Sequence, residues 1–266
     1  MESDVAQQLA PRLHVEEQGS GFPLLLIQGL GYAVRAWRHQ LAAFAAHHRV
    51  VAFDNRGAGR SGKPPGPYSI ADLADDAARV LDERELSRAD VLGLSMGGYV
   101  AQALALARPD LVERLVLVST SPGRPEALPQ PAATSEAWAA ARGLAPEEFA
   151  RATAPYSFAP GWTERHPAEY ESLLASRLEF PTPPECWAAQ YAACEDFLAR
   201  NLPVDEIAAP TLVVHGDLDR VVDPGNGALL ARRVPGARLV RFPDCGHLVP
   251  LEAPERFNEI VLEHLA

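Results

Sequence analysis

Short apolar runs alternate with stretches of helical periodicity along most of this 266-residue chain. Six runs rich in Val, Leu and Ile have the length and flanking residues of buried parallel strands: Leu24–Gln28, Val50–Phe53, Val91–Leu94, Leu115–Ser119, Thr211–His215 and Arg238–Phe242. The stretches between them carry Ala and Leu at helical spacing: Val34–Ala46, Ile70–Arg84, Met96–Ala107, Ala228–Val234 and Pro254–Leu265. This alternation predicts an α/β fold with a mostly parallel, doubly wound sheet and helices on both faces. Residues around Leu13–Glu16 are expected to add an antiparallel strand or two.

Residues 121–200 interrupt this alternation. They carry 11 of the 24 prolines and 10 of the 19 aromatic residues, in helix-like pieces without a strand signal. We therefore expect a core domain formed by residues 1–120 and 201–266, with a helical insertion over 121–200. Segments above the carboxyl ends of parallel strands are where such sheets bind ligands, so we interpret the insertion as a lid. Additional core or a dimer surface is the alternative.

The charge and cysteine content exclude several function classes. A net charge of −11 opposes a nucleic-acid or anionic-membrane partner, because such surfaces need clustered Lys and Arg. No apolar run is long enough to span a bilayer, and the first residues lack a secretory signal pattern. Cys186, Cys194 and Cys245 are too irregularly spaced for a disulfide framework or a zinc site. These features predict a cytoplasmic protein without a metal site. The sequence does not decide between a monomer and a homodimer.

A glycine-flanked serine lies where one predicted strand ends and a helix begins. The segment Gly93-Leu94-Ser95-Met96-Gly97 fits G-x-S-x-G, in which a tight turn presents a nucleophilic serine. The glycines leave room for a strained serine backbone, and Gly98 allows the helix to approach the sheet. The helix N-terminus directs N–H groups toward any oxygen that becomes negative beside Ser95. We predict that Ser95 is a nucleophile; a simple helix cap is the alternative.

A serine nucleophile needs a base within hydrogen-bond reach. Four of the eight histidines are poor candidates: His47 and His48 precede a strand at the opposite end of the sheet, and His39 and His264 are expected on helices facing solvent. His247 follows the last predicted strand, so it emerges at the same carboxyl end as Ser95. We predict that His247 is the base.

An acid is needed to hold the histidine tautomer and to stabilise the imidazolium. The loop after the strand Thr211–His215 offers Asp217, Asp219 and Asp223. We predict that Asp219 is the acid, because it lies far enough past the strand end to turn back toward His247. Asp217 and Asp223 are expected to cap the turn and the next helix. The other position for an acid, after the strand that ends at Ser119, has no carboxylate.

These motifs resemble the alpha/beta-hydrolase fold family over nearly the whole chain. Leu26–Gly31 is similar to the first conserved turn of the family, and Phe53–Ser61 resembles its D-x-R-G-x-G-x-S turn. The family's order of nucleophile, acid and base is also the order found here. Within the family the chain is most similar to the small carboxylesterases and 3-oxoadipate enol-lactonases. The resemblance implies an oxyanion hole formed by the backbone N–H groups of Leu30 and Met96. The family often has His-Gly in the first turn, where this chain has Gln28-Gly29.

One segment imitates a dinucleotide-binding motif. Residues 57–62 match G-x-G-x-x-G and follow a predicted strand. That motif must open a helix, yet Lys63-Pro64-Pro65-Gly66-Pro67 follows, and such a segment cannot continue a helix. Nucleotide binding is therefore not expected.

The residues together predict a cofactor-free serine hydrolase that acts on a small to medium, largely hydrophobic ester or lactone through an acyl-enzyme. We expect the substrate pocket to be lined by Gly29, Tyr32, Trp138, Trp162 and Trp187. Four arginines of the insertion could receive a substrate carboxylate, or could simply be solvated: Arg142, Arg151, Arg165 and Arg177. Alternatives are an enol-lactonase, a cofactor-free haloperoxidase or perhydrolase, and a ligand receptor with a nearly silent triad.

Overall fold

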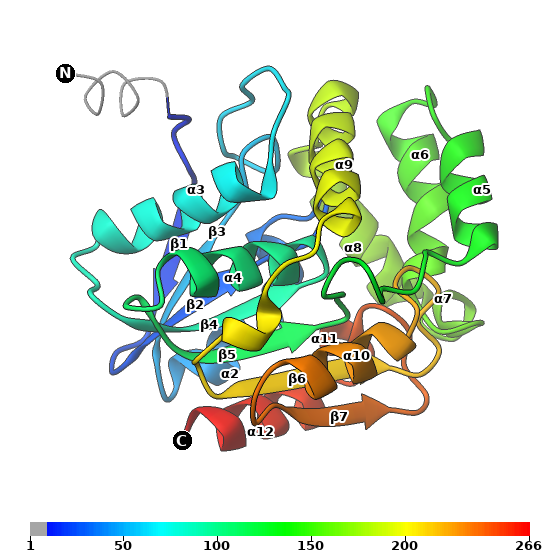
Figure 1. Ribbon diagram of the computed structural model, residues 1–266. Helices are drawn as coiled ribbons and strands as arrows, with labels where there is room; N and C mark the ends of the chain where they lie inside the picture. Colours follow the sequence, from blue (N-terminus) through cyan, green and yellow to red (C-terminus); the bar gives the residue numbers. More distant parts are fainter. Residues whose placement is uncertain (1–9) are drawn as a thin grey trace.

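The computed structural model describes residues 10–266, and its centre is a seven-stranded sheet (Figure 1). The strands are β1 (Val15–Gln18), β2 (Pro23–Ile27), β3 (Arg49–Phe53), β4 (Ala89–Leu94), β5 (Val112–Val118), β6 (Thr211–Gly216) and β7 (Arg238–Phe242). Their spatial order is β1-β3-β2-β4-β5-β6-β7. β1 runs antiparallel to β3, and all other neighbours are parallel. The predicted mostly parallel sheet is confirmed, and the amino-terminal segment adds one antiparallel strand to it.

Helices cover both faces of the sheet because the buried strands point alternate side chains into two apolar layers. In β2, Leu25 lies in one layer and Leu26 in the other. The first layer is covered by α3 (Ile70–Asp82), α4 (Met96–Ala107) and α10 (Gly225–Arg233), and the second by α2 (Leu41–Ala45) and α12 (Pro254–Leu265) (Figure 1). The doubly wound arrangement is therefore confirmed.

The continuous helix predicted over Val34–Ala46 is wrong. The segment forms a short 3-10 helix, η1 (Val34–Trp37), followed by α2. Gln40 lies fully buried at the break, and its side-chain amide donates to the backbone carbonyl of Pro250 and to the side chain of Asn258. Contacts with a distant part of the chain override the local helical spacing here.

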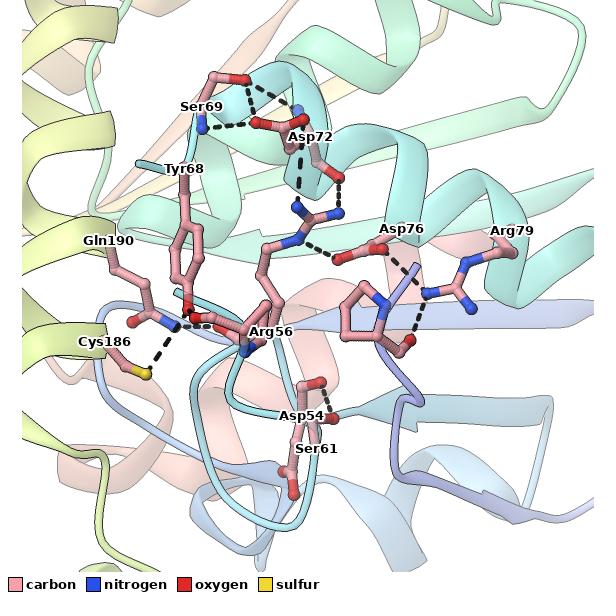
Figure 2. Close-up of polar contacts among 12 residues, drawn as sticks. Asp54, Arg56, Ser61, Tyr68, Ser69, Asp72, Asp76, Arg79, Cys186 and Gln190 are labelled. Carbon is pink, nitrogen blue, oxygen red and sulfur yellow. Dashed lines mark hydrogen bonds and ion pairs between the residues drawn. The ribbon is translucent and has the colours of Figure 1, made fainter. Parts of the chain in front are cut away.

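The turn after β3 is fixed to α3 by a cluster of largely buried charges (Figure 2). Arg56 donates to one oxygen of the Asp76 carboxylate at 2.6 Å, and Arg79 donates to the other oxygen at 3.0 Å. α3 begins with a capping box, in which the side chains of Ser69 and Asp72 each accept a backbone N–H from the other residue. A loop separates this turn from α3, so the turn does not open a helix as a dinucleotide-binding motif would.

Residues 121–200 lie between β5 and β6 and are all within the described part of the chain. Their regular elements are helical: α5 (Ala132–Ala140), α6 (Pro146–Thr153), η2 (Ala154–Ser157), α7 (Trp162–Arg165), α8 (Pro167–Glu179) and α9 (Pro184–Ala199). This helical segment lies at the edge where the parallel strands end (Figure 1). We refer to residues 121–200 as the lid, after the role that the sequence analysis expects of them.

The remaining helical pieces are η3 (Val204–Glu206) and α11 (Val249–Glu252). No helix within residues 10–266 has the length and hydropathy needed to cross a bilayer. Cys186, Cys194 and Cys245 are buried as free thiols.

Candidate active site

Ser95 lies in the turn between β4 and α4, at the carboxyl edge of the sheet. Its backbone has φ 57° and ψ −118°, a strained conformation for a residue with a side chain. The Ser95 N–H donates to the carbonyl of Val118 in β5 at 2.8 Å, which fixes the turn to the sheet. The Ser95 side chain makes no capping hydrogen bond to α4. Helix capping therefore does not account for the serine.

Three glycines make this turn possible. A Cβ at Gly93 would lie 2.2 Å from the carbonyl oxygen of Gly97, and a Cβ at Gly97 would lie 2.1 Å from that of Ile27. A Cβ at Gly98 would lie 2.6 Å from the side chain of Thr120, just beyond β5. The glycines thus serve the close packing that the sequence pattern predicts.

His247 lies in the loop after β7, and its Nδ1 is 2.8 Å from Oδ2 of Asp219. Both side chains are buried. Oδ1 of Asp219 accepts the N–H groups of Val221 and Val222 at 2.7 and 2.9 Å. Burial by itself would raise the pKa of Asp219, but the charge of His247 and hydrogen bonds with His215 and His247 outweigh it and hold this pKa well below its usual range. Asp219 is therefore a fixed anion that can orient the His247 ring.

His215 is a second histidine on the same carboxylate, and the sequence reasoning missed it. It is fully buried in β6, and its Nε2 lies 3.1 Å from Oδ2 of Asp219 and 3.1 Å from the carbonyl of Val222. Because both neighbours are acceptors, Nε2 of His215 carries a proton. A histidine near the end of an apolar strand, four residues before the predicted acid, was the available sequence signal.

The two other loop carboxylates have different partners. Asp217 forms a surface ion pair with Arg241 at 2.6 Å, so the expectation that Asp217 caps the turn is wrong. Asp223 accepts the N–H of Gly225 at 2.8 Å, at the start of α10, as expected. Of the three carboxylates, Asp219 is the one that contacts His247.

Two further histidines are less exposed than predicted. His39 lies in the turn between η1 and α2, where its Nε2 is 3.0 Å from a carboxylate oxygen of Glu169 in α8. His264 lies in α12 with its Nε2 buried, and burial lowers its pKa. The lid covers His39, and the protein core covers His264.

Within residues 10–266, no group of three His, Cys, Asp or Glu side chains is arranged to hold a metal ion.

Glu252 in α11 ties the His247 loop to the lid. One of its carboxylate oxygens accepts the N–H of Gly246, the residue before His247, and the other accepts the N–H of Ala159 in the lid, both at 2.9 Å. The carbonyl of Ser157 accepts the N–H groups of His247 and Leu248 at 3.1 Å each. The position of the base therefore depends on contacts with residues 157–159 of the lid. Burial of Glu252 outweighs these hydrogen bonds and raises its pKa to about 7.

This raised pKa predicts how stability depends on pH. The folded state binds the Glu252 proton more tightly than the unfolded state, so the stabilisation is complete below pH 4 and is lost as the pH rises through 7. Glu252→Gln does not titrate in this range. We therefore expect the free energy of unfolding of the wild type, relative to Glu252→Gln, to fall by on the order of 2 kcal/mol between about pH 4.5 and pH 7.5. Urea unfolding at several pH values measures this difference, and a constant or rising difference would contradict the assignment.

Two residues whose backbone N–H groups have no partner within residues 10–266 line the same cavity as Ser95. Leu30, in the turn after β2, and Met96, the first residue of α4, both line this cavity. Within the described part of the chain, neither N–H donates a hydrogen bond. Unpaired donors of this kind are available to an oxygen that gains negative charge beside Ser95.

The turn that carries Leu30 is supported by side-chain amides. Oε1 of Gln28 accepts the N–H of Gly29 at 3.1 Å, and the Asn55 amide donates to the Gln28 carbonyl at 2.9 Å. Gln28, at the position where the family that the chain resembles often has histidine, therefore supports the turn from within.

Gln190 joins this turn to the lid. It is fully buried in α9, its Oε1 accepts the N–H of Gly31 at 3.0 Å, and its Nε2 donates to the carbonyl of Arg56 at 2.7 Å. Figure 2 shows Gln190 reaching from α9 toward Arg56. One lid side chain thus contacts both the turn after β2 and the turn after β3, and the sequence pattern gave no sign of it.

The catalytic cavity, which we define as the cavity lined by both Ser95 and His247, has a volume of about 90 Å³. The pocket residues predicted from the sequence that also line it are Gly29, Tyr32, Trp138 and Trp187. No hydrogen bond joins the Ser95 hydroxyl to His247 among the described contacts; such bonds often tighten only when substrate is present.

Trp162 does not line this cavity, contrary to expectation. It is buried in the core, where its ring stacks on Phe158 at 4.3 Å between centroids. An aromatic residue of the lid can serve packing as well as binding, and composition alone does not separate the two roles.

Comparisons with known proteins agree with this architecture. A family model described as the alpha/beta hydrolase fold matches residues 23–254. The chain is 32% identical to 2-hydroxymuconate semialdehyde hydrolase of Pseudomonas sp. (strain CF600) over 96% of this chain and 90% of that protein. The solved enol-lactonase of Burkholderia xenovorans LB400 is 30% identical over 97% of both chains, with a TM-score of 0.85. A thermophilic esterase from Thermogutta terrifontis is 30% identical over 95% of this chain and 92% of that chain, with a TM-score of 0.81. The chain belongs to the alpha/beta hydrolase fold family.

Proposed function

We propose that this protein is a cofactor-free serine hydrolase that cleaves an ester or lactone. The observation that carries the proposal is the pairing of His247 with the buried Asp219 carboxylate, while Ser95 lines the same cavity as His247. A serine, a base held in one tautomer, and unpaired N–H donors are the parts that acyl transfer requires.

In the proposed reaction, His247 takes the Ser95 hydroxyl proton on Nε2 as Oγ attacks the substrate carbonyl carbon. The Nδ1–H of His247 donates a hydrogen bond to Asp219, whose negative charge stabilises the imidazolium. The N–H groups of Leu30 and Met96 hold the oxyanion. The bond to the leaving alcohol breaks as His247 donates its proton to that oxygen. Water, deprotonated by His247, then attacks the acyl-enzyme and releases the acid.

The apolar lining supports a largely hydrophobic acyl or alcohol group. Leu30, Met96, Trp138 and Trp187 face the catalytic cavity. Among proteins that are about 30% identical to this chain, one is an enol-lactonase and another an esterase. We propose the same broad class of substrate here, a carboxylic ester or a lactone.

An active-site fluorophosphonate tests the proposal. We expect it to label Ser95, as identified by peptide mass, and we expect unlabelled enzyme to turn over p-nitrophenyl acetate many times. Ser95→Ala is the control that should not be labelled. A folded enzyme that resists labelling would contradict the proposal. Labelling with a single turnover would instead favour a ligand receptor, and peracid formation from acetate and hydrogen peroxide would favour a perhydrolase.

A further inference from the structure

A second and larger cavity lies within the lid. Its volume is about 470 Å³, and it is bounded by α6, α8, α9 and the segment between α5 and α6. Its lining is mostly apolar and includes Leu144, Pro146, Leu178, Pro181 and Ala188. It opens to solvent, since all of these except the half-buried Leu178 are exposed. We call it the lid cavity. It adjoins the catalytic cavity, because some side chains line both.

The two volumes indicate that the two cavities hold different parts of a substrate. Sites for drug-sized ligands typically have volumes of ~300–1,000 Å³, and an apolar cavity of ~150 Å³ accepts one benzene. The catalytic cavity, at about 90 Å³, has room for little beyond the reacting carbonyl and its nearest atoms. The lid cavity, at about 470 Å³, has room for the rest of a medium-sized substrate.

The side chains shared by the two cavities form a wall that rests on the turn carrying Leu30. They are Phe149, Arg177, Trp187 and Tyr191. The Trp187 ring stacks on Tyr191 with centroids 5.2 Å apart, and Phe149 meets it edge-on at 5.0 Å. A Cβ at Gly31 would lie 3.0 Å from the Trp187 ring, so the wall is in contact with this turn. A substrate that spans both cavities must pass these side chains.

The four lid arginines, which the sequence does not distinguish, have different environments in the structure. Arg151 binds the carboxylates of Glu147 and Glu171, and Arg165 donates to a backbone carbonyl at the surface. Arg142 and Arg177 both line the lid cavity. Within residues 10–266, neither has a carboxylate within ion-pair distance.

Arg177 is the better placed of these two cations. It is half-buried in the shared wall, and its guanidinium lies over the Tyr32 ring at 4.4 Å from the centroid. Its contact with the Tyr32 hydroxyl is long, at 3.5 Å, so its hydrogen-bonding capacity is largely unused. No Asp or Glu is among the described residues that line the lid cavity. An open apolar cavity with a guanidinium free of carboxylates at its inner wall matches an apolar group that carries a carboxylate.

We propose that the lid cavity is a second substrate compartment that binds an apolar chain bearing a carboxylate, with Arg177 as the residue that binds the carboxylate. The inference rests on the proposed function, because the chain is taken to be part of the ester or lactone cleaved at Ser95. The substrate class is therefore a carboxylated, medium-length apolar ester or lactone.

The first test compares two esters of equal length, p-nitrophenyl octanoate and the mono-p-nitrophenyl ester of octanedioic acid. In Arg177→Met, the ratio of kcat/KM for the anionic ester to that for the neutral ester should fall at least about tenfold, mainly through KM. Arg151→Met, which removes a lid arginine already paired with glutamates, should leave the ratio within about twofold. An unchanged ratio in Arg177→Met would overturn the role of Arg177.

The second test fills the compartment. Ala188 lines the lid cavity from α9, whereas Ala192, on the same helix, lines neither cavity. Both alanines are exposed, so the two changes are matched in burial. Ala188→Trp should lower the ratio of kcat/KM for the octanoate to that for the acetate at least about tenfold, and Ala192→Trp should leave it within about twofold. An unaltered ratio in Ala188→Trp would show that the chain binds elsewhere.

A binding measurement keeps the inference separate from the proposed reaction. Octanedioate should change the tryptophan fluorescence of Ser95→Ala through the rings of Trp138 and Trp187, and the additional change Arg177→Met should weaken this binding about tenfold. Absence of acetate hydrolysis by the unmodified enzyme would overturn the proposed function alone. Absence of octanedioate binding would overturn the compartment alone.

Discussion

Replacing Ser95 by alanine is expected to lower kcat for p-nitrophenyl acetate about 10⁴-fold or more, with little effect on the melting temperature. The attacking oxygen is lost, while the Cβ that the turn already accommodates at φ 57° is kept. The Ser95 side chain makes no capping hydrogen bond to α4, so its removal costs the helix little. Initial-rate assays measure kcat, and a thermal melt measures the melting temperature.

Residual turnover within about tenfold of the wild type, in a folded sample, would show that another group performs the attack. A matched Gly97→Ala variant provides the contrast. Its new Cβ would lie 2.1 Å from the Ile27 carbonyl oxygen, so this change should lower both the melting temperature and the activity.

The second large effect is expected at the acid. Asp219→Asn should lower kcat about 10³-fold or more. The asparagine amide can place an N–H where Nδ1 of His247 now has an acceptor. The His247 ring would then rotate or change its tautomer. The buried carboxylate also accepts two backbone N–H groups, so some loss of stability should accompany the loss of rate.

Asp217→Asn is the matched control for this prediction. Asp217 lies two residues earlier and pairs with Arg241 at the surface, where one ion pair contributes little to stability. Its kcat should remain within about twofold of the wild type. A larger loss of kcat in Asp217→Asn than in Asp219→Asn would mean that Asp219 is not the acid.

The parts of the site that could be predicted are those specified by local sequence. Strand, tight turn and helix follow one another in the chain around Ser95, and the glycines that permit the turn are sequence neighbours of it. The alternation that located the strands also placed the loops of Asp219 and His247 at one edge, because parallel strands share their carboxyl ends. The local pattern was therefore enough to place Ser95, Asp219 and His247 at the same edge of the sheet.

The parts that could not be predicted depend on contacts between distant segments. Gln190 supports the turn carrying Leu30 from the lid, and Glu252 joins the lid to the His247 loop. The break before α2 arises because Gln40 bonds to residues more than two hundred positions away. Single polar side chains of this kind leave no periodic signal, since their partners are set only by the folded chain.

The buried amide of Gln190 limits which lids this protein can accept from a relative. A transplanted lid without a glutamine at this position of α9 would leave the N–H of Gly31 and the carbonyl of Arg56 without their partner. We expect chimaeras to recover activity only when the donor helix supplies a glutamine there. In this chain the lid and the turns after β2 and β3 are joined through Gln190. We therefore expect an exchange of specificity to succeed more readily by substitution of the wall residues than by exchange of the whole lid.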